Sequence, residues 1–585
     1  MVDQGMVQVL NEKYLRKAVS GRRALQENLV RPEAIVTLEQ KEDGSAAVIK
    51  REEPGRMRKI PLSSGGRLIL DFGDHQVGYV TLRFSLQRGP QDSPAYIRLK
   101  FGEDAREILE RSEDYHGWIS RSWIQEEYLH IDILPAAVEL PRRYAFRYME
   151  LEVIDTSRKW ELVLEDAECR AVSAVKEQEE AGAYAELSLL AGELVGKAAC
   201  EGHGESAGNL VHGECGECAG RAVHEEREER AGKAVHEAAR EPDVEKMRRE
   251  MEQICRVSLR TLKNCMQDVF EDGPKRDRRL WLGDLRLQAL SDYASFKNYD
   301  LVKRCLYLFA GMTRQDGKIS ACLFVEPEHQ ADNTFLFDYS LFFISTLRDY
   351  YEETKDKATL EDLWEPAKAQ LEIAAREFDE SGWIRKDTVY GSFIDWKDGL
   401  DKQSCSQAVY IFAAKDLRRI ADILGKQTNA EWLDREIREK ENAAWSYAWD
   451  AQKGLFVSGP ARQISYATQV WMILAGVPDV KEGQQILARL EMEEQAVGMG
   501  TPYMNHHYVE ALFLCGEKEK AVRHILYYWG GMVRQGADTF WEVYDPEDPQ
   551  GSPYGSSIVN SYCHAWSCTP IYFIRKYGRG TKGQE

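Results

Sequence analysis

The sequence predicts a multidomain β plus α protein, in which an N-terminal antiparallel β-sandwich precedes an (α/α)6 barrel. Two observations lead to this fold class. From about residue 27 to residue 166, short runs alternate apolar and polar residues and are separated by Gly, Pro, Asp and Ser. From residue 245 onward, apolar residues recur with the period of a helix instead. A chain of 585 residues is long enough for several domains, each with its own core.

The predicted sandwich rests on four runs of alternating residues. They lie at residues 68–73, 78–86, 95–101 and 149–155. Successive side chains of a strand point to opposite faces, so alternation is typical of strands with one buried face. Several short strands separated by turn residues indicate an antiparallel sandwich. We place this domain at residues 1–174.

Residues 175–243 differ from both flanking regions. They are rich in Ala, Gly and Glu, and a repeat beginning Ala-Gly recurs at residues 207, 219 and 231, after a related copy at residue 191. The segment carries too little apolar mass for a core, so we predict a flexible or loosely helical insert. It contains Cys215 and Cys218 in a CxxC arrangement, with several His residues nearby. A metal site is the alternative, but no second CxxC follows and the repeat itself places the His residues.

About twelve amphipathic segments follow, and we assign residues 244–585 to one helical domain. Gly425, after a long periodic segment, is typical of a helix end. Twelve helices with Gly, Pro and Trp in the longer connections fit an (α/α)6 barrel. A solenoid of helix pairs is the alternative, but no helical repeat of fixed period is visible. The segments are at residues 245–267, 284–297, 299–313, 334–353, 358–379, 403–424, 428–447, 464–476, 480–491, 504–515, 517–531 and 556–577.

The composition limits the classes of partner. The formal net charge of −20 argues against nucleic acid, because phosphate binding needs basic patches. A neutral small-molecule carbohydrate is compatible with this charge, and so is self-association into a homo-oligomer. No run of 18 apolar residues and no signal peptide is visible, and the 12 Cys are scattered. We therefore expect a cytoplasmic protein without a membrane span.

Residues 271–284 (EDGPKRDRRLWLGD) form the densest cluster of functional groups. Gly273 and Pro274 exclude a regular helix, so this segment is predicted to be a loop before the next helix. It carries Asp272, Asp277 and Asp284 together with basic residues and a Trp. Glycosidic bond hydrolysis needs a protonated carboxylic acid and, for inversion, a second carboxylate that activates water. A solvated Asp/Arg network that caps the helix is the alternative.

Two further clusters combine carboxylates with aromatic residues. The first contains Glu542 between aromatic residues, followed by residues 560–568 (NSYCHAWSC), and we expect His564 and Trp566 to begin a helix. A lone buried His is more often a hydrogen-bonded core residue than a ligand. The second cluster is Asp395 and its neighbours in residues 391–399 (GSFIDWKDG), which could equally be a turn with a packed Trp.

These motifs resemble, in the same order, those of family 78 glycoside hydrolases, the α-L-rhamnosidases. Residues 272–284, 393–396, 539–542 and 561–567 carry the resemblance in the helical part. Residues 68–73 and 140–148 look like the β-sandwich part of that family. The resemblance covers most of the chain apart from residues 175–243, and it suggests a minimal form without the C-terminal β domain of many members.

The resemblance implies a role for each matching residue. Asp277 takes the position of the general acid, and Glu542 that of the general base that activates water. The implied mechanism is inversion of configuration, which needs no metal and no organic cofactor. The residues implied to bind or enclose rhamnose, or to orient Glu542, are Asp272, Arg276, Trp281, Asp284, Asp395, Trp396, Trp541 and His564.

One departure from the family pattern concerns the acid itself. The family usually has Glu where this chain has Asp277, and a different register would place Arg278 there, which could not donate a proton. Arg276 and Arg278 also flank Asp277, and a guanidinium close to it would lower its pKa. A catalytically inert sugar-binding relative, or an (α/α)6 phosphorylase or lyase, is therefore the alternative to a rhamnosidase.

Overall fold

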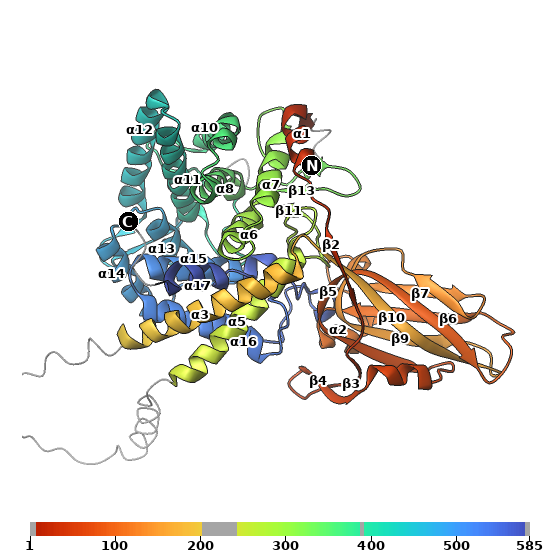
Figure 1. Ribbon diagram of the computed structural model, residues 1–585. Coiled ribbons are helices and arrows are strands. Elements are labelled where there is room, and N and C mark those ends of the chain that lie inside the picture. Colours follow the sequence, from red (N-terminus) through yellow and green to blue (C-terminus); the bar gives the residue numbers. More distant parts are fainter. Residues whose placement is uncertain (1–7, 202–242, 387–390, 580–585) are drawn as a thin grey trace, which may run out of the picture.

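The structure is a computed structural model that describes residues 8–201, 243–386 and 391–579. Figure 1 shows a β-rich N-terminal part beside a larger helical part. The predicted repeat copies at residues 207, 219 and 231, and the CxxC of Cys215 and Cys218, lie outside the described residues. No helix within the described ranges is long and apolar enough to cross a membrane.

Nine strands form one antiparallel sheet in the N-terminal part, which confirms the predicted antiparallel β domain. The 21-residue β5 joins its parts, because it pairs with β3 near one end and with β10 near the other. Two runs predicted as separate strands are both in β5, whose pairing with β9 shifts register between Asp71 and Gln76. The strands are β2 (Gln26–Val30), β3 (Ala34–Gln40), β4 (Ala46–Glu52), β5 (Arg67–Gln87), β6 (Ala95–Gly102), β7 (Glu126–Ile131), β8 (Ala136–Glu139), β9 (Tyr144–Asp155) and β10 (Glu161–Ser173).

The first described residues belong with the helical part rather than with the sheet. Strand β1 (Gln8–Leu10) pairs with β12 (Met312–Arg314), and helix α1 (Glu12–Ser20) packs on α7 (Tyr299–Gly311). The side chain of Asn11 caps α1 by accepting from the backbone N–H groups of Lys13 and Tyr14. The connection between β6 and β7 contains helix α2 (Ala105–Leu109), which faces the helical part.

The helical part follows the predicted succession of helices closely. Helix α6 packs on α8, α8 on α11, α11 on α13 and α13 on α15, and α17 packs back on α6. The other helices are α5 (Val244–Cys265), α6 (Leu282–Ala294), α8 (Phe337–Thr354), α9 (Lys357–Asp362), α10 (Trp364–Ala374), α11 (Gln403–Ile423), α12 (Gln427–Ala443), α13 (Tyr466–Leu474), α14 (Val480–Leu490), α15 (Pro502–Leu514), α16 (Lys518–Arg534) and α17 (Pro570–Gly578). Short strands β11 (Leu280–Trp281), β13 (Cys322–Phe324), β14 (Gln330–Ala331), β15 (Trp449–Asp450) and β16 (Leu455–Phe456) lie between them.

Residues 177–201, expected to belong to a flexible or loosely helical insert, form the ordered helix α3 (Glu177–Glu201). This helix packs on α5, α16 and α17, and Figure 1 shows it lying alongside α5. Its contact face is buried at helical spacing through Leu187, Ala191, Leu194 and Ala198. These residues, small or leucine, complete the helical core even though the segment contains few aromatics.

A second correction concerns the predicted helix over residues 556–577. Only its last part is an α-helix, since α17 begins at Pro570. His564 and Trp566 therefore do not begin that helix. They lie in an irregular connection with a short turn of 3-10 helix at Ala565–Ser567, and Pro570 suits the first turn of the helix after it.

Candidate active site

The loop between α5 and α6 is folded around the carboxylate of Asp272. The Oδ2 atom accepts the backbone N–H of Asp277 at 3.2 Å, and Oδ1 accepts the backbone N–H of Arg279 at 3.0 Å. The Asp272 backbone N–H donates to the carbonyl of Arg279, also at 3.0 Å. Asp272 thus holds the loop in shape and presents Arg276 and Asp277 at its turn.

Backbone hydrogen bonds attach the second predicted cluster to this loop. Glu542 N–H donates to the carbonyl of Ser561 at 3.0 Å, and His564 N–H donates to that of Phe540 at 2.8 Å. Ala565 N–H donates to the carbonyl of Asp272 at 2.8 Å. Three segments that are far apart in the sequence therefore meet at one place.

Arg276 lies between the two predicted catalytic carboxylates. Its Nη2 atom forms a short ion pair with Oε2 of Glu542, and its Nη1 atom is 3.9 Å from Oδ1 of Asp277. The guanidinium also lies over the ring of Tyr554, 4.3 Å from the ring centroid. Arg276 and Glu542 are both buried. One cation consequently holds Glu542 in place while also facing Asp277.

Asp277 differs from the other carboxylates of the site in its contacts. Its ion pairs within the described residues are long, 3.9 Å to Arg276 and 4.0 Å to Arg279, and its side chain remains 23% exposed. Burial raises the pKa of Asp277, although the two guanidinium groups act in the opposite direction. Arg278, the other flanking arginine, is turned away and donates to the carbonyl of Arg143. Asp277 is therefore partly accessible, and its pKa lies above that of a free aspartic acid.

Asp284 and His564 form a buried pair beside these groups. His564 Nε2 lies 3.2 Å from Oδ1 of Asp284. Burial opposes a charge on His564, but the hydrogen bond to Asp284 and the charge of Glu542 outweigh it and raise its pKa. The other ring nitrogen, Nδ1, is buried without a partner among the described residues. An unpartnered polar atom at this position is suited to a ligand hydroxyl.

Burial also raises the pKa values of two neighbouring carboxyl groups. The pKa of Asp272 rises to about 8, with the charge of Asp277 adding to the effect of burial. The pKa of Asp284 rises as well, although its hydrogen bond with His564 lowers it in part. Both carboxyl groups therefore hold their protons at higher pH than a free aspartic acid does.

Aromatic rings surround this group of charges. Trp281 contacts Tyr339 edge to face with ring centroids 6.3 Å apart, and Phe393 contacts both Tyr339 and Trp566 at 5.6 Å. Trp566 also lies 4.5 Å from the ring of His564 and donates its indole N–H to the carbonyl of Glu542. Among the tryptophans predicted to line the pocket, Trp281 therefore lies close to the site, through its contact with Tyr339.

Trp396 contacts Tyr554 edge to face and is 43% exposed. The two ring centroids are 5.9 Å apart. The neighbouring Asp395, expected to contact substrate, instead holds its own loop. Its carboxylate accepts from the backbone N–H groups of Trp396 and Gly500 and from the hydroxyl of Thr501, at 2.7–2.8 Å. These bonds fix Trp396 against the start of α15.

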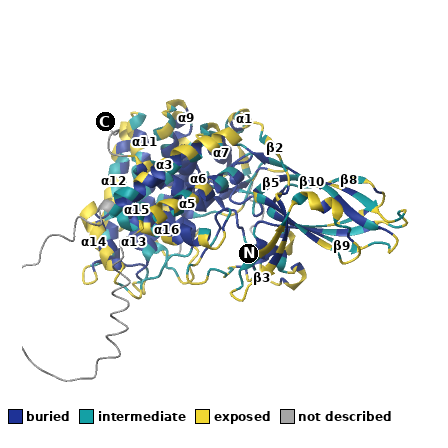
Figure 2. Cartoon of the chain, turned by 60° about the horizontal axis from the view of Figure 1, so that its bottom comes forward, coloured by how far each residue is buried: buried dark blue, intermediate teal, exposed yellow. Residues whose placement is uncertain are grey.

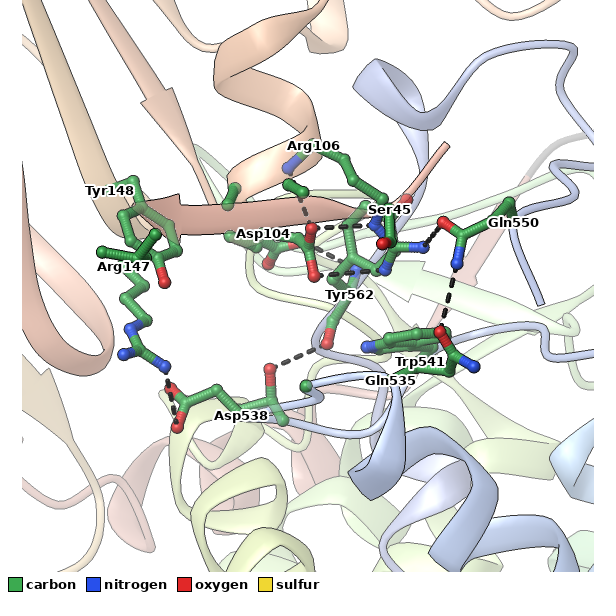
Figure 3. Close-up of a pocket in the computed structure, with 16 residues that line it drawn as sticks. Ser45, Asp104, Arg106, Arg147, Tyr148, Gln535, Asp538, Trp541, Gln550 and Tyr562 are labelled. Atoms are coloured by element: carbon green, nitrogen blue, oxygen red, sulfur yellow. Dashed lines mark hydrogen bonds and ion pairs between the residues drawn. The ribbon is translucent and has the colours of Figure 1, made fainter. Parts of the chain in front are cut away.

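Trp541, also expected in the pocket wall, points elsewhere. Its ring lies under the guanidinium of Arg106 at 4.5 Å and contacts Tyr562. It lines a separate cavity between the sheet and the helical part, where Arg106 also bonds to Asp104 and Gln550 (Figure 3). Glu542, the next residue, pairs instead with Arg276, so the two adjacent side chains contact different groups.

The sequence alone did not identify several residues of the site. Tyr554 and Tyr339 lie in segments without a recognisable motif, and their packing on Arg276 and Trp281 identifies them. Phe393 belongs to the motif at residues 393–396 but is identified as a site residue only by its contact with Trp566. Arg279 is near Asp277 because the loop turns back on Asp272. No group of three or more His, Cys, Asp or Glu side chains suited to a metal ion occurs in the described part of the chain.

Two family models match the chain and together account for most of it. The glycosyl hydrolase family 78 α-rhamnosidase N-terminal domain matches residues 32–171. The bacterial α-L-rhamnosidase 6 hairpin glycosidase domain matches residues 243–577. The comparison with curated protein sequences gave no match.

Solved structures of rhamnosidases resemble the chain over most of its length. A rhamnosidase from Klebsiella oxytoca with rhamnose bound is 39% identical, with a TM-score of 0.83, over 98% of this chain and 100% of that one. The family 78 rhamnosidase of Bacillus sp. GL1 is 20% identical, with a TM-score of 0.65, over 90% of this chain and 49% of that one. The Streptomyces avermitilis α-L-rhamnosidase complexed with L-rhamnose is 14% identical, with a TM-score of 0.58, over 94% and 44%. The last two share the fold, and this chain spans about half of their lengths.

Proposed function

The chain belongs to glycosyl hydrolase family 78, the α-L-rhamnosidases, and from this membership we propose that it releases terminal α-L-rhamnose from small glycosides with inversion. The observation that carries the proposal is the pair of carboxylates on either side of Arg276. Asp277 is partly exposed and has a raised pKa, and Glu542 is held in an ion pair with Arg276. An inverting hydrolase needs one group of each kind.

Asp277 is the proposed general acid. Its raised pKa and partial exposure suit a group that donates a proton to the departing glycosidic oxygen. The carboxylates of Asp272 and Asp395 are less suited to this role, because backbone N–H groups already bind both of their oxygens.

Glu542 is the proposed general base. Arg276 binds its Oε2 atom in a buried ion pair and holds the carboxylate in place. Oε1 is left to take a proton from the water molecule that attacks the anomeric carbon. The proton that Asp277 gives to the leaving group and the proton that Glu542 takes from water balance over one turnover.

His564, Asp284 and Trp281 are proposed to hold the sugar. The unpartnered Nδ1 of His564 can bond a ring hydroxyl, while Asp284 fixes the imidazole from its other side. Trp281 and its aromatic neighbours can cover an apolar face of the ring. The description of the Klebsiella oxytoca relative with rhamnose bound supports this choice of sugar.

We propose that the helical domain, residues 244–585, closes as an (α/α)6 barrel, and the return of α17 onto α6 supports this. Residues 1–174 form the proposed β-sandwich domain, and residues 175–243 the proposed insert, with α3 packed as described. A cytoplasmic location is supported by the nine buried cysteines of the described residues, all of which are free.

Hydrolysis of p-nitrophenyl α-L-rhamnoside tests the proposal. We expect Asp277→Asn and Glu542→Gln each to lower kcat by roughly 10²–10⁴-fold, the usual contribution of a general acid or base. Proton NMR of the first sugar released should show the β anomer, because inversion converts the α linkage. Circular dichroism and Tm should stay close to those of wild type.

Two control variants match the catalytic variants by residue type, and each removes an exposed carboxylate. Asp398→Asn and Glu547→Gln should keep wild-type kcat, because both side chains are exposed. Unchanged kcat in Asp277→Asn would reject Asp277 as the acid. Turnover only in the presence of phosphate would indicate a phosphorylase, and binding of rhamnose without turnover would indicate an inert relative.

A further inference from the structure

A loop of the β domain reaches the edge of the candidate active site. It lies between Ser112–Asp114 and Arg121–Trp123, two short turns of 3-10 helix in the connection from β6 to β7. At its tip is Trp118, which is 71% exposed. Such a large exposed aromatic side chain is a candidate for contact with a ligand.

The position of this loop is fixed by packing and not only by chain connectivity. Tyr115 and Ile124, at its two ends, form a small buried cluster with Tyr554, Ile558 and Val559 of the helical part. Trp118 donates its indole N–H to the carbonyl of Pro553 at 3.3 Å. The loop and the Tyr554 segment are thus anchored to one another.

Gly117 shows how close this approach is. A Cβ atom at Gly117 would lie 2.4 Å from the carbonyl oxygen of Tyr554, which is too close for any side chain. Glycine allows the backbone of the loop to lie directly against the Tyr554 segment. Trp118, the next residue, is consequently held next to Tyr554.

Two exposed tryptophans therefore contact Tyr554, one from each domain. The ring centroid of Trp118 is 5.5 Å from that of Tyr554, and the centroid of Trp396 is 5.9 Å away. Tyr554 itself is buried and carries the guanidinium of Arg276 at 4.3 Å. Arg276 in turn faces Asp277 and binds Glu542. The two tryptophans thus lie one ring away from the catalytic charges.

We propose that Trp118 and Trp396 form the binding site for the leaving group, and that they select glycosides whose leaving group is a flat aromatic ring. This rests on the proposed function, since it places the leaving group beside the proton donor Asp277. Trp118 already donates its indole N–H to the carbonyl of Pro553, so it can contact a leaving group mainly through the apolar face of its ring. A second sugar would need polar partners for its hydroxyls, whereas an aromatic ring is stabilised by stacking alone.

Calorimetry with two uncleaved thioglycosides tests this proposal without depending on turnover. The probes are methyl and p-nitrophenyl 1-thio-α-L-rhamnoside, which share the sugar and differ only in the aromatic group. We expect the aryl compound to bind wild type up to about tenfold more tightly, which is the order of one aromatic contact. Trp118→Ala and Trp396→Ala should each remove most of this preference, and Trp118→Ala should leave binding of the methyl compound unchanged.

Two further variants sharpen the result. Gly117→Ala displaces the loop without removing any aromatic ring, and should also weaken the preference for the aryl compound. Tyr128→Ala removes an aromatic residue of the same domain that is 49% exposed but lies on β7, and should keep the preference.

The outcomes separate the two proposals. Equal binding of both compounds to wild type, or a preference that persists in Trp118→Ala, would overturn the leaving-group site and leave the rhamnosidase proposal standing. Binding of neither compound would reject rhamnose as the sugar, and the leaving-group site with it.

Discussion

At the scale of single residues, the proton on Asp277 depends on two opposing effects. Burial raises its pKa, while Arg276 and Arg279, each with a nitrogen about 4 Å from its carboxylate, lower it. Burial prevails, so Asp277 holds its proton at higher pH than a free aspartic acid would. The acid form is the active one, and kcat should fall as pH rises through this pKa.

Arg279→Met should move that alkaline limb to higher pH. Removing a positive charge about 4 Å from the acid raises its pKa by roughly one unit. Methionine keeps an apolar contact with Phe324, on which the guanidinium now lies. The measurement is the pH profile of kcat for p-nitrophenyl α-L-rhamnoside.

Arg314→Met is a suitable control, because Arg314 lies over Phe335 in the same manner. Its pH profile should match that of wild type. An alkaline limb that does not move in Arg279→Met would mean that a group other than Asp277 controls it.

The sequence predicted which residue types gather at the site better than it predicted where each one points. The structure brings Asp277, Arg276 and Glu542 together, and it pairs Asp284 with His564. Asp395 and Trp541 belong to the same motifs, but Asp395 bonds within its own loop and Trp541 lines the separate cavity. A motif records the identity and order of residues, whereas the direction of a side chain is decided by loop dihedrals and tertiary contacts that no single segment contains.

At the scale of elements, helical periodicity predicted the bounds of most helices to within a few residues. The reason is that the apolar residues of a buried helix face recur at helical spacing along the sequence. It failed for α3, where the buried face is made of Ala and Leu and the composition resembles that of the repeats after it. It also failed for residues 556–569, where a helical pattern of apolar residues belongs to an irregular segment packed in the site. Tertiary contacts decided both cases.

Leu194→Ala tests whether α3 is part of the folded core. Leu194 is 1% exposed, and removing such a side chain costs about 2–5 kcal/mol of unfolding free energy because a cavity remains. Leu189→Ala on the same helix is the matched control, since Leu189 is 73% exposed. Urea denaturation of both variants should show a large loss only for Leu194→Ala, and equal losses would contradict the packing of α3.

At the scale of the whole molecule, the β domain supports the catalytic loop through buried charges. Lys275, next to Arg276, bonds to Glu107 of α2 at 2.6 Å and lies 3.6 Å from Glu103. Arg143 of the same domain bonds to Glu271 at 2.7 Å. Figure 2 shows that the junction of the two parts is largely buried. The sequence could not predict this contact between the domains. Lys275 and Glu107 are 168 residues apart, and no motif links the two positions.

The two glutamates of this junction share one lysine and therefore differ in charge. Burial opposes the charge on Glu103, but Lys275 and a hydrogen bond from His75 outweigh it and lower its pKa. Burial raises the pKa of Glu107 from 4.5 to about 8, against the attraction of Lys275 and with the charge of Glu103 adding to the rise. Near neutral pH the junction thus holds one ionised and one protonated carboxyl.

This arrangement predicts that the molecule loses stability as pH rises toward 8. A group whose folded pKa is raised contributes stability that is complete below its unfolded pKa and is lost as pH rises through its folded pKa. For Glu107 that window runs from 4.5 to about 8, with a slope of at most about 1.4 kcal/mol per pH unit. Glu107→Gln cannot ionise, so its Tm should fall less with pH. Its Tm should also start lower, because an amide nitrogen cannot accept the hydrogen bond that Lys275 donates to Glu107 Oε2. Glu42→Gln, at an exposed position of the same domain, should keep the wild-type slope. A Glu107→Gln slope equal to that of wild type would show that the domain junction does not set the pH dependence of folding.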